Sequence, residues 1–252
     1  EGAFGDFIYA EGEYFHDVDD RCNLREVQRS REASAAGREW IALREEYRRR
    51  GARSGPMHYP THSTCGPVCV MNAHALKVTA CGYRNRNDDP YFRDCAFSNE
   101  TAFFEMSNGA CARICEFREV AGSIAGHETF RVLGTRGSYV EFQWKENFRT
   151  TPGTAKPLAV AKLTPEEMRD PLPEEVLKAW YNTSKECVEY GGHGGSHAYL
   201  VHEFVEAVAH NRQPAINIWE SVRYMAMGVA AHQSALRDGE RLSVPDWGDA
   251  PK

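Results

Sequence analysis

Hydrophobic and polar positions alternate along much of the first 150 residues, which is typical of strands with two different faces. The segment 7–16 alternates in this way, and further strand-like runs lie at 76–82, 101–107, 110–120, 129–134 and 138–144. Asn108-Gly109 separates two of these runs. It predicts a two-residue hairpin turn of type I′, in which both residues have positive φ.

Helical spacing of apolar residues appears in other segments. A small, apolar stretch at 65–75 predicts a buried helix. Two amphipathic helices are expected at 196–210 and 219–237, each with an apolar stripe that we expect to pack on one face of the sheet. The sequence thus predicts a sheet covered by helices on one side.

Two segments interrupt this pattern. Residues 17–54 form a charged, Arg- and Glu-rich excursion with helical character at 39–49, either a solvated surface or a site for phosphate or an acidic partner. Residues 147–173 are rich in proline and predict a long loop, with a short helix starting at Thr164-Pro165.

Neighbouring antiparallel strands with helices grouped before and after them predict an α+β fold rather than an alternating βαβ series. We expect a single domain over 1–252, with an open, predominantly antiparallel sheet and helices packed on one face. No G-x-G-x-x-G or P-loop follows a strand. We expect the other sheet face to pack on a second subunit, because a bare apolar face would aggregate.

Composition and charge exclude two classes of partner. With 36 acidic and 30 basic residues, the formal charge of −6 opposes binding to nucleic acid. No apolar run approaches the roughly 20 residues needed to span a membrane. The chain begins without a signal peptide pattern, and its eight cysteines form no C-x-x-C pair. A cytoplasmic location with reduced thiols is expected, although a signal cleaved before Glu1 would leave the same sequence.

Candidate chemistry begins with the segment 58–62, His-Tyr-Pro-Thr-His. Pro60 fixes the backbone of what we expect to be a short rigid turn that presents Tyr59 and His62 together. A phenol and an imidazole can exchange protons with a carbon or hydroxyl centre. The alternative is a packing role or a helix start.

A second polar cluster lies at the end of the first strand. Alternation places Glu11 and Glu13 on one face and Tyr14 and His16 on the other, where the last two can share a pocket. The alternative interpretation is an edge strand with acids that face solvent.

A glycine-rich segment at 191–195 precedes the helix expected at 196–210. Gly192 and Gly194 flank His193 and allow the backbone to approach an oxygen-rich ligand closely. A flexible loop capped by Ser196 is the alternative. Zinc-like spacings such as His62-x-x-Cys65 exist, but no complete ligand set is indicated, so no metal is expected.

In order along the chain, these motifs resemble a known family. GAFGDFIYAEGEY at 2–14 and FRVLGTRGS at 130–138 are similar to the sheet motifs of the C-terminal domain of Gfo/Idh/MocA oxidoreductases. YPTH at 59–62 and GGHGG at 191–195 look most like the NAD-dependent glycosidase branch that includes α-N-acetylgalactosaminidases.

The resemblance implies a sugar or glycoside as substrate. Relatives in that branch oxidise the sugar at C3 with NAD⁺, which acidifies the C2 proton, and then eliminate the aglycone, add water and reduce the sugar again. By resemblance, Tyr14 lies where the C2 base is proposed, Tyr59 and His62 contact the hydroxyl that is oxidised, and His16 and His193 line the same site.

The resemblance also implies NAD or NADP, bound mainly by an N-terminal Rossmann domain that these residues do not contain. Hydride transfer requires the cofactor against the substrate, so we expect this chain alone to be inactive. A homo-oligomer formed through the sheet is expected. The alternative from another functional class is a carbohydrate-binding or oligomerisation module without catalysis.

Overall fold

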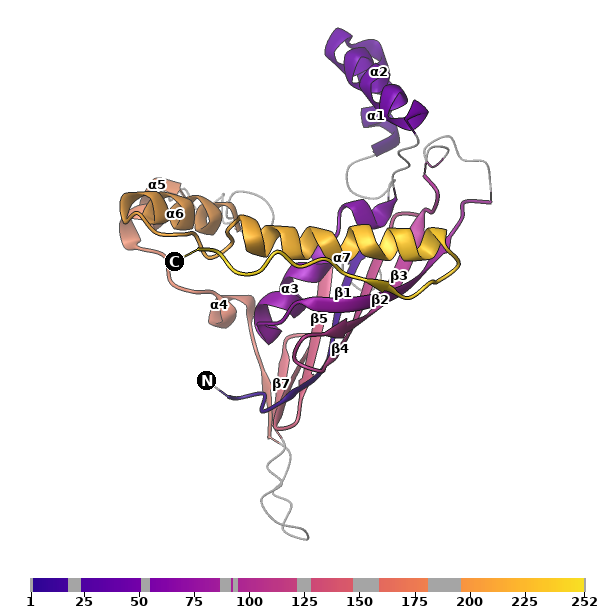
Figure 1. The fold of residues 1–252 in the computed structure, drawn as a ribbon. Helices are drawn as coiled ribbons and strands as arrows, with labels where there is room; N and C mark the ends of the chain where they lie inside the picture. Colours follow the sequence, from indigo (N-terminus) through magenta and orange to yellow (C-terminus); the bar gives the residue numbers. More distant parts are fainter. Residues whose placement is uncertain are drawn as a thin grey trace. The chain divides into compact units, whose positions relative to one another are not determined.

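Figure 1 shows the course of the chain in the computed structural model. The structure describes residues 2–17, 24–50, 55–86, 92, 95–121, 128–146, 159–180 and 196–251. These residues belong to two compact units, one formed by 1–162 with 222–246 and the other by 163–221 with 247–252.

An open sheet is the centre of the larger unit. Over the described residues it has nine strands in the order β8-β7-β6-β5-β1-β4-β3-β2-β9. The strands are β1 (Phe7–Phe15), β2 (Ala75–Tyr83), β3 (Asn99–Met106), β4 (Cys111–Phe117), β5 (Glu128–Gly134), β6 (Gly137–Val140), β7 (Gln143–Glu146), β8 (Ala159–Lys162) and β9 (Leu242–Ser243). All pairs are antiparallel except β1 with β4. The predicted α+β fold with a mostly antiparallel sheet is confirmed.

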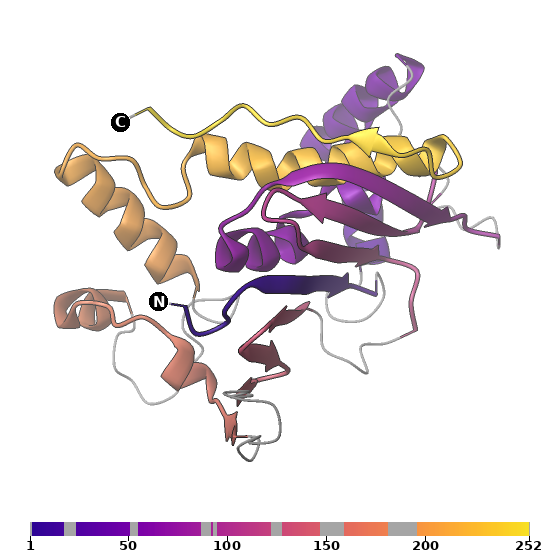
Figure 2. The ribbon, with the colours of Figure 1, turned by 60° about the horizontal axis from the view of Figure 1, so that its bottom comes forward.

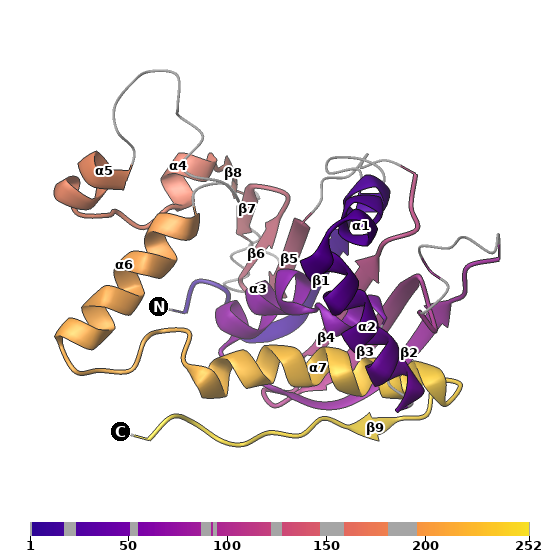
Figure 3. The ribbon, with the colours of Figure 1, turned by 90° about the horizontal axis from the view of Figure 1, so that it is seen from above.

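Helices cover one face of this sheet, as Figures 2 and 3 show for α3 (Thr61–Met71) and for α7 (Ile218–Leu236) from Val222 onward. Inward-facing residues of the central strands, such as Ile114 and Phe104, share one buried core with Met227 and Ala231 of α7. Alternation in the strands and helical spacing in α7 both direct apolar side chains into this layer. The helix expected at 219–237 is therefore present on this face as α7, together with α3, whereas the helix expected at 196–210 is α6 (Ser196–Ala209) of the smaller unit.

The hairpin expected at Asn108-Gly109 joins β3 and β4, but its turn type differs from the prediction. Only Gly109 has positive φ, at +84°. The Met106 N–H donates to the Ala110 carbonyl at 2.9 Å, which leaves a three-residue loop rather than a two-residue one. A glycine in the left-handed region at the third loop position is the usual form of such a loop.

A two-residue turn of the primed kind occurs elsewhere. Glu141 and Phe142 have φ of 48° and 59°, and Val140 pairs with Gln143 across them. The strand predicted at 138–144 is therefore wrong, because this turn divides it into β6 and β7. Neither turn residue is Gly or Asn, so the sequence lacks the usual signal. Strand β8 also replaces part of the loop expected at 147–173.

Helix α3 begins earlier than the expected 65–75. The Pro60 carbonyl accepts the backbone N–H groups of Ser63 at 3.0 Å and Thr64 at 2.8 Å, so the helix starts directly after the proline. Asn72 ends it in the left-handed region, with φ of 46°. His62 consequently lies in the first turn of a helix. The turn predicted over 58–62 is therefore limited to the residues before Thr61, where a short 3₁₀ helix, η1, spans Pro56–His58.

Close approach of α3 to β1 depends on two special residues. A Cβ on Gly12 would lie 1.7 Å from the Ser63 carbonyl oxygen, so the strand accepts the helix only because residue 12 has no side chain. The same carbonyl would receive the N–H of residue 67 in a regular helix, but Pro67 has none. Gly12 and Pro67 together let the helix backbone lie directly on the strand.

The helical character expected at 39–49 is confirmed by α2 (Ala35–Arg49), and a further helix, α1 (Leu24–Ala33), precedes it. The two helices pack against each other, and the Ser34 side chain caps α2 by accepting the Gly37 N–H at 3.0 Å. The guanidinium groups of Arg31 and Arg44 lie 4.3 Å and 4.8 Å from the centre of the Trp40 ring. The two guanidinium groups thus make cation–π contacts with the Trp40 ring.

The smaller unit contains α4 (Pro165–Met168), α5 (Glu174–Trp180), α6 (Ser196–Ala209) and the first residues of α7. The short helix expected after Thr164 is present, and the Thr164 N–H donates to Glu167 at 2.8 Å as in a capping box. The apolar stripe predicted on α6 exists, yet Phe204 and Val208 are exposed in the described structure. Across the described ranges, no helix has the length and apolar character of a membrane span.

Candidate functional site

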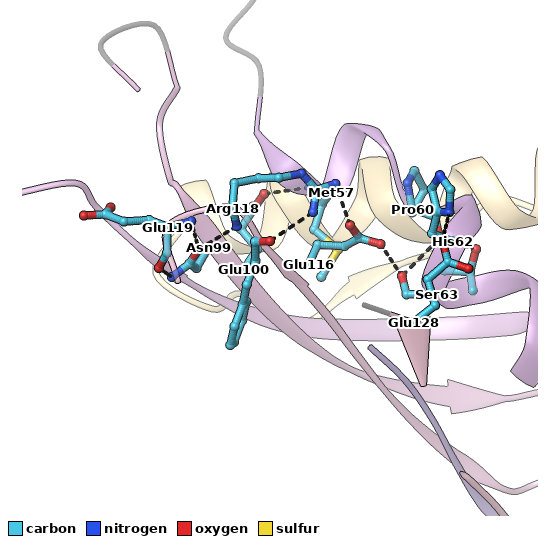
Figure 4. Close-up of polar contacts among 12 residues, drawn as sticks. Met57, Pro60, His62, Ser63, Asn99, Glu100, Glu116, Arg118, Glu119 and Glu128 are labelled. Atoms are coloured by element: carbon cyan, nitrogen blue, oxygen red, sulfur yellow. Dashed lines mark hydrogen bonds and ion pairs between the residues drawn. The ribbon is translucent and has the colours of Figure 1, made fainter. Parts of the chain in front are cut away.

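Four residues form a row across the helix-covered face of the sheet. Tyr14 of β1 is paired in register with Glu116 of β4 on one side and with Glu128 of β5 on the other. Glu116 is paired in turn with Glu100 of β3. Figure 4 shows the three acids along this row. Three carboxyl groups and a phenol therefore meet at one level of the sheet.

Aromatic rings stack over Tyr14. The His62 ring lies 4.3 Å from the Tyr14 ring at an interplanar angle of 11°, and the His16 ring lies 5.3 Å away on the same strand. Tyr59 lies 5.0 Å from His62. Tyr14 is 9% exposed and Tyr59 is 58% exposed, so the cluster runs from the protein interior to its surface.

His62 is oriented by an acid. Its Nδ1 contacts Glu128 Oε1, as Figure 4 shows. A carboxylate at one ring nitrogen fixes the orientation of an imidazole and leaves the other nitrogen, here Nε2, to exchange a proton with a ligand. The pair has the arrangement of a general base with its orienting group.

Glu116 is fully buried and has two partners. The Ser63 hydroxyl donates to Oε1, and Arg118 Nη2 donates to Oε2 at 2.9 Å. Burial raises the pKa of Glu116 to about 7, although Arg118 and Ser63 both act to lower it. This carboxyl group links α3, next to His62, with the end of β4.

The Arg118 guanidinium lies over the Tyr14 ring, with its central carbon 4.5 Å from the centre of that ring. Burial raises the pKa of Tyr14 to about 12. Arg118 opposes this increase, while Glu128 and Glu116 add to it. Tyr14 is therefore a protonated phenol at neutral pH, beside a cation that would stabilise its phenolate.

A buried pair holds the segment before α3. Glu100 accepts the Met57 N–H at 3.1 Å and contacts His232 Nδ1 of α7 at 2.7 Å. The His58 ring lies 4.5 Å from that of His232, and burial followed by the His232 charge lowers the pKa of His58. A Cβ on Gly55 would lie 2.7 Å from both members of the pair. The turn that presents Tyr59 is thus fixed to the core.

The structure brings together four of the residues expected at the site, Tyr14, His16, Tyr59 and His62. His193, Gly192 and Gly194 lie outside the described residues, and their place at the site stays a prediction. The edge-strand alternative for β1 is wrong, since β1 is central. Glu11, on the opposite sheet face, is buried and contacts Arg113 at 3.0 Å.

Sequence reasoning missed five residues of this region: Glu100, Glu116, Arg118, Glu128 and His232. A signal for Glu116 existed, because strand alternation places it on the same face as Ile114, where an acid is unusual. His232 had a weaker signal, as a histidine on the apolar side of α7. Glu128 and Arg118 lie at strand ends, where alternation gives no information.

No group of three or more His, Cys, Asp or Glu residues suited to a metal ion occurs within the described ranges. The cysteines described there are Cys65, Cys69, Cys81, Cys95, Cys111 and Cys115. The chemistry of the described site therefore rests on phenol, imidazole, guanidinium and carboxyl groups.

Comparison with known proteins identifies the fold around this site. Residues 127–250, just under half of the chain, match the family model for the glycosyl hydrolase 109 C-terminal domain. No curated protein matches the sequence. A levoglucosan dehydrogenase in complex with NADH is similar with a TM-score of 0.62 and 16% identity, over 97% of this chain and 60% of that chain.

Two further solved structures are similar. An oxidoreductase domain protein from Kribbella flavida has a TM-score of 0.60 and 13% identity, over 97% of this chain and 61% of that chain. A myo-inositol 2-dehydrogenase from Lactobacillus plantarum has a TM-score of 0.54 and 13% identity, over 97% of this chain and 58% of that chain. The chain thus spans about 60% of the length of the first of these solved structures.

Proposed function

We propose that the chain is the C-terminal domain of a Gfo/Idh/MocA-type oxidoreductase and that it holds the substrate of an NAD(P)-dependent enzyme that acts on a sugar or glycoside; the match of residues 127–250 to the glycosyl hydrolase 109 C-terminal domain and the similarity in fold to levoglucosan dehydrogenase support this proposal. The observation that carries this proposal is the stack of Tyr14, His62 and Tyr59. The stack brings together three proton-transfer groups from two separate segments, close to the C-terminal end of the central strand β1. Such groups collect at sites rather than in cores.

The finer proposal is redox-assisted glycoside cleavage, which the match to the glycosyl hydrolase 109 model supports. A dinucleotide held by an N-terminal domain would accept the hydride from C3 of the sugar and later return it. The C3 hydroxyl proton would go to His62, oriented by Glu128, while Tyr59 binds the same hydroxyl. The resulting ketone acidifies the C2 proton, and loss of that proton allows the aglycone to leave C1. Water would then add its hydroxyl to C1 and a proton to C2 of the unsaturated ketone before the hydride returns to C3.

Tyr14 is the group that we assign to the C2 proton. It stacks on His62, so a sugar ring that reaches His62 with one carbon presents the neighbouring carbon to Tyr14. Its pKa near 12 requires that a positive charge stabilise the phenolate before it can accept a proton. Arg118 supplies a charge of that sign beside the ring.

The second candidate function is a non-catalytic carbohydrate-binding or oligomerisation module. The exposed Tyr59 ring is consistent with it, because aromatic rings form good surfaces for sugars. The contact of Glu128 with His62 and the buried Glu116 beside Tyr14 favour catalysis instead, since sugar binding alone does not need an oriented imidazole.

The test uses the full-length protein with nitrophenyl glycosides of several sugars in D₂O. Aglycone release with deuterium at C2 of the product, and no accumulation of NADH, is the expected result. Oxidised sugar with stoichiometric NADH and no aglycone would replace the glycosidase proposal by a simple dehydrogenase. Sugar binding in calorimetry without either reaction would favour the module.

Matched variants on β1 sharpen this test. Tyr14→Phe should lower C2 exchange by roughly 10²-fold or more, the scale for removing a positioned acid or base. Tyr9→Phe is the control, because Tyr9 lies on the opposite face of the same strand, where its hydroxyl donates to Glu11 at 2.7 Å. Equal exchange in both variants would exclude Tyr14 as the base.

A further inference from the structure

The environment of Arg118 is built to hold its charge in one place. Nη2 donates to Glu116 Oε2 at 2.9 Å, and Nη1 donates to the Phe117 carbonyl at 3.1 Å. The Arg118 backbone N–H donates to Asn99 Oδ1 at 2.9 Å. With its side chain only 13% exposed, the guanidinium has little freedom to leave the Tyr14 ring.

Glu116 is fixed as firmly as the arginine that it binds. It is completely buried, its second oxygen accepts the Ser63 hydroxyl of α3, and its backbone is paired with Tyr14 in the sheet. A buried charge is retained only where partners compensate for its desolvation. The Arg118 and Glu116 pair is therefore a rigid feature of the wall beside Tyr14.

We propose that Arg118 and Glu116 form a charge pair that sets how readily Tyr14 gives up its proton, with the guanidinium stabilising the phenolate and Glu116 both fixing the guanidinium and moderating its effect. The inference rests on the proposed function, in which Tyr14 receives a proton from the substrate. Arg118 and Glu116 act through Tyr14, so they are positioning residues rather than catalytic ones.

Charges of both signs surround the phenol, and the net effect depends on their balance. Among the residues that the structure describes, the titratable groups that face Tyr14 are His16 on its own strand, His62 and Tyr59 from the α3 side, Glu116 of β4, Arg118 just after β4, and Glu128 of β5. Among the charges that act on Tyr14, Arg118 has the largest effect. An opposite charge at about 4–6 Å typically shifts a pKa by about 1–3 units.

Opposite effects of two substitutions test the inference. In the full-length protein, tyrosine labelled with ¹³C at Cζ reports the phenolate fraction of Tyr14, whose signal is identified by its loss in Tyr14→Phe. Arg118→Met removes the cation and should lower that fraction about tenfold at a given alkaline pH. Glu116→Gln keeps the shape of the side chain, removes the negative charge and should raise the fraction.

Two further variants complete the design. Arg118→Lys keeps the charge and should recover part of the phenolate fraction, which also covers the case in which the methionine variant does not fold. Arg131→Met is the matched control, since Arg131 contacts Glu11 at 3.1 Å on the opposite sheet face, and it should leave the Tyr14 signal unchanged.

Shifts of the same sign for Arg118→Met and Glu116→Gln, or no shift, would overturn the inference, because a merely structural pair disturbs Tyr14 without regard to sign. The phenolate signal is measured without catalytic turnover, so the charge-pair proposal and the proposed function can be refuted independently of each other. If the shifts appear but Tyr14→Phe keeps full turnover, the proposed function is wrong and the charge pair stands. If Tyr14→Phe is inactive and the shifts are absent, the charge pair is wrong.

Discussion

Replacing Glu100 by alanine should destabilise the domain by about 3–5 kcal/mol, because the substitution leaves two buried groups without their hydrogen-bond partner. Glu100 is 1% exposed and serves two groups at once, the Met57 N–H at 3.1 Å and His232 Nδ1 at 2.7 Å. Each group left buried without a partner costs about 1–3 kcal/mol. The two losses together account for the expected range.

Urea unfolding of the full-length protein, with the midpoint and slope measured for each variant, provides the assay. Glu100→Gln keeps an oxygen for the Met57 N–H and should cost less, about 1–2 kcal/mol, because only the charge is lost. Glu105→Ala is the matched control on the same strand. Glu105 is 42% exposed and pairs with Lys77 at 3.9 Å, so its loss should cost under about 1 kcal/mol.

The loss of unfolding free energy in Glu100→Ala is compared with that in Glu105→Ala, which changes an exposed residue of the same strand. If Glu100→Ala costs no more than Glu105→Ala, the pair with His232 does not hold the turn before α3, and the account of how Tyr59 is positioned fails. A large cost for Glu100→Ala with an equally large cost for Glu100→Gln would place the energy in the charge rather than in the hydrogen bond to Met57.

Three other changes have defined outcomes. His62→Ala in the full-length enzyme should lower kcat by roughly 10²-fold or more, and unchanged turnover in steady-state assays would remove its role. Gly12→Ala places a Cβ 1.7 Å from the Ser63 carbonyl and should lower the melting temperature by pushing α3 off β1, at a cost of about 1–3 kcal/mol or more. Glu116 has a folded pKa of about 7, above its ordinary 4.5, so it favours the folded state most below about pH 4.5 and loses that contribution as pH rises through 7. Relative to Glu116→Gln, wild-type stability in urea should therefore fall by up to about 3 kcal/mol across this window, and parallel pH curves would contradict the burial of this acid.

Local signals in the sequence predicted most elements of the fold, because apolar and polar residues roughly alternate along most strands. The failures lie where the chain departs from common turn chemistry. Glu141 and Phe142 adopt positive φ without the residues that usually allow it, and α3 begins at Pro60 rather than at its apolar stretch. In both places tertiary contacts select a conformation that local preference does not.

The sequence predicted some residues of the candidate site and missed others. Tyr14 and His62 stood out because they occur in short motifs of reactive residues. Glu116 and Glu128 flank Tyr14 only through the register of β4 and β5, and register depends on pairing across the whole sheet. The sequence therefore did not reveal these two acids as site residues, because the strand register that places them beside Tyr14 cannot be read from local patterns.

That row also ties the site to the order of folding. Tyr14 lies next to Glu116 and Glu128, which follow it by roughly a hundred residues, and closing such long loops is slow compared with forming a hairpin such as β3–β4. The parallel pairing of β1 with β4 must therefore wait until β2, β3 and β4 have been synthesised, and the pairing of β1 with β5 must wait longer still. An incompletely folded chain holds its reactive phenol, imidazole and acids apart, so the site assembles only when the long-range core of the domain does.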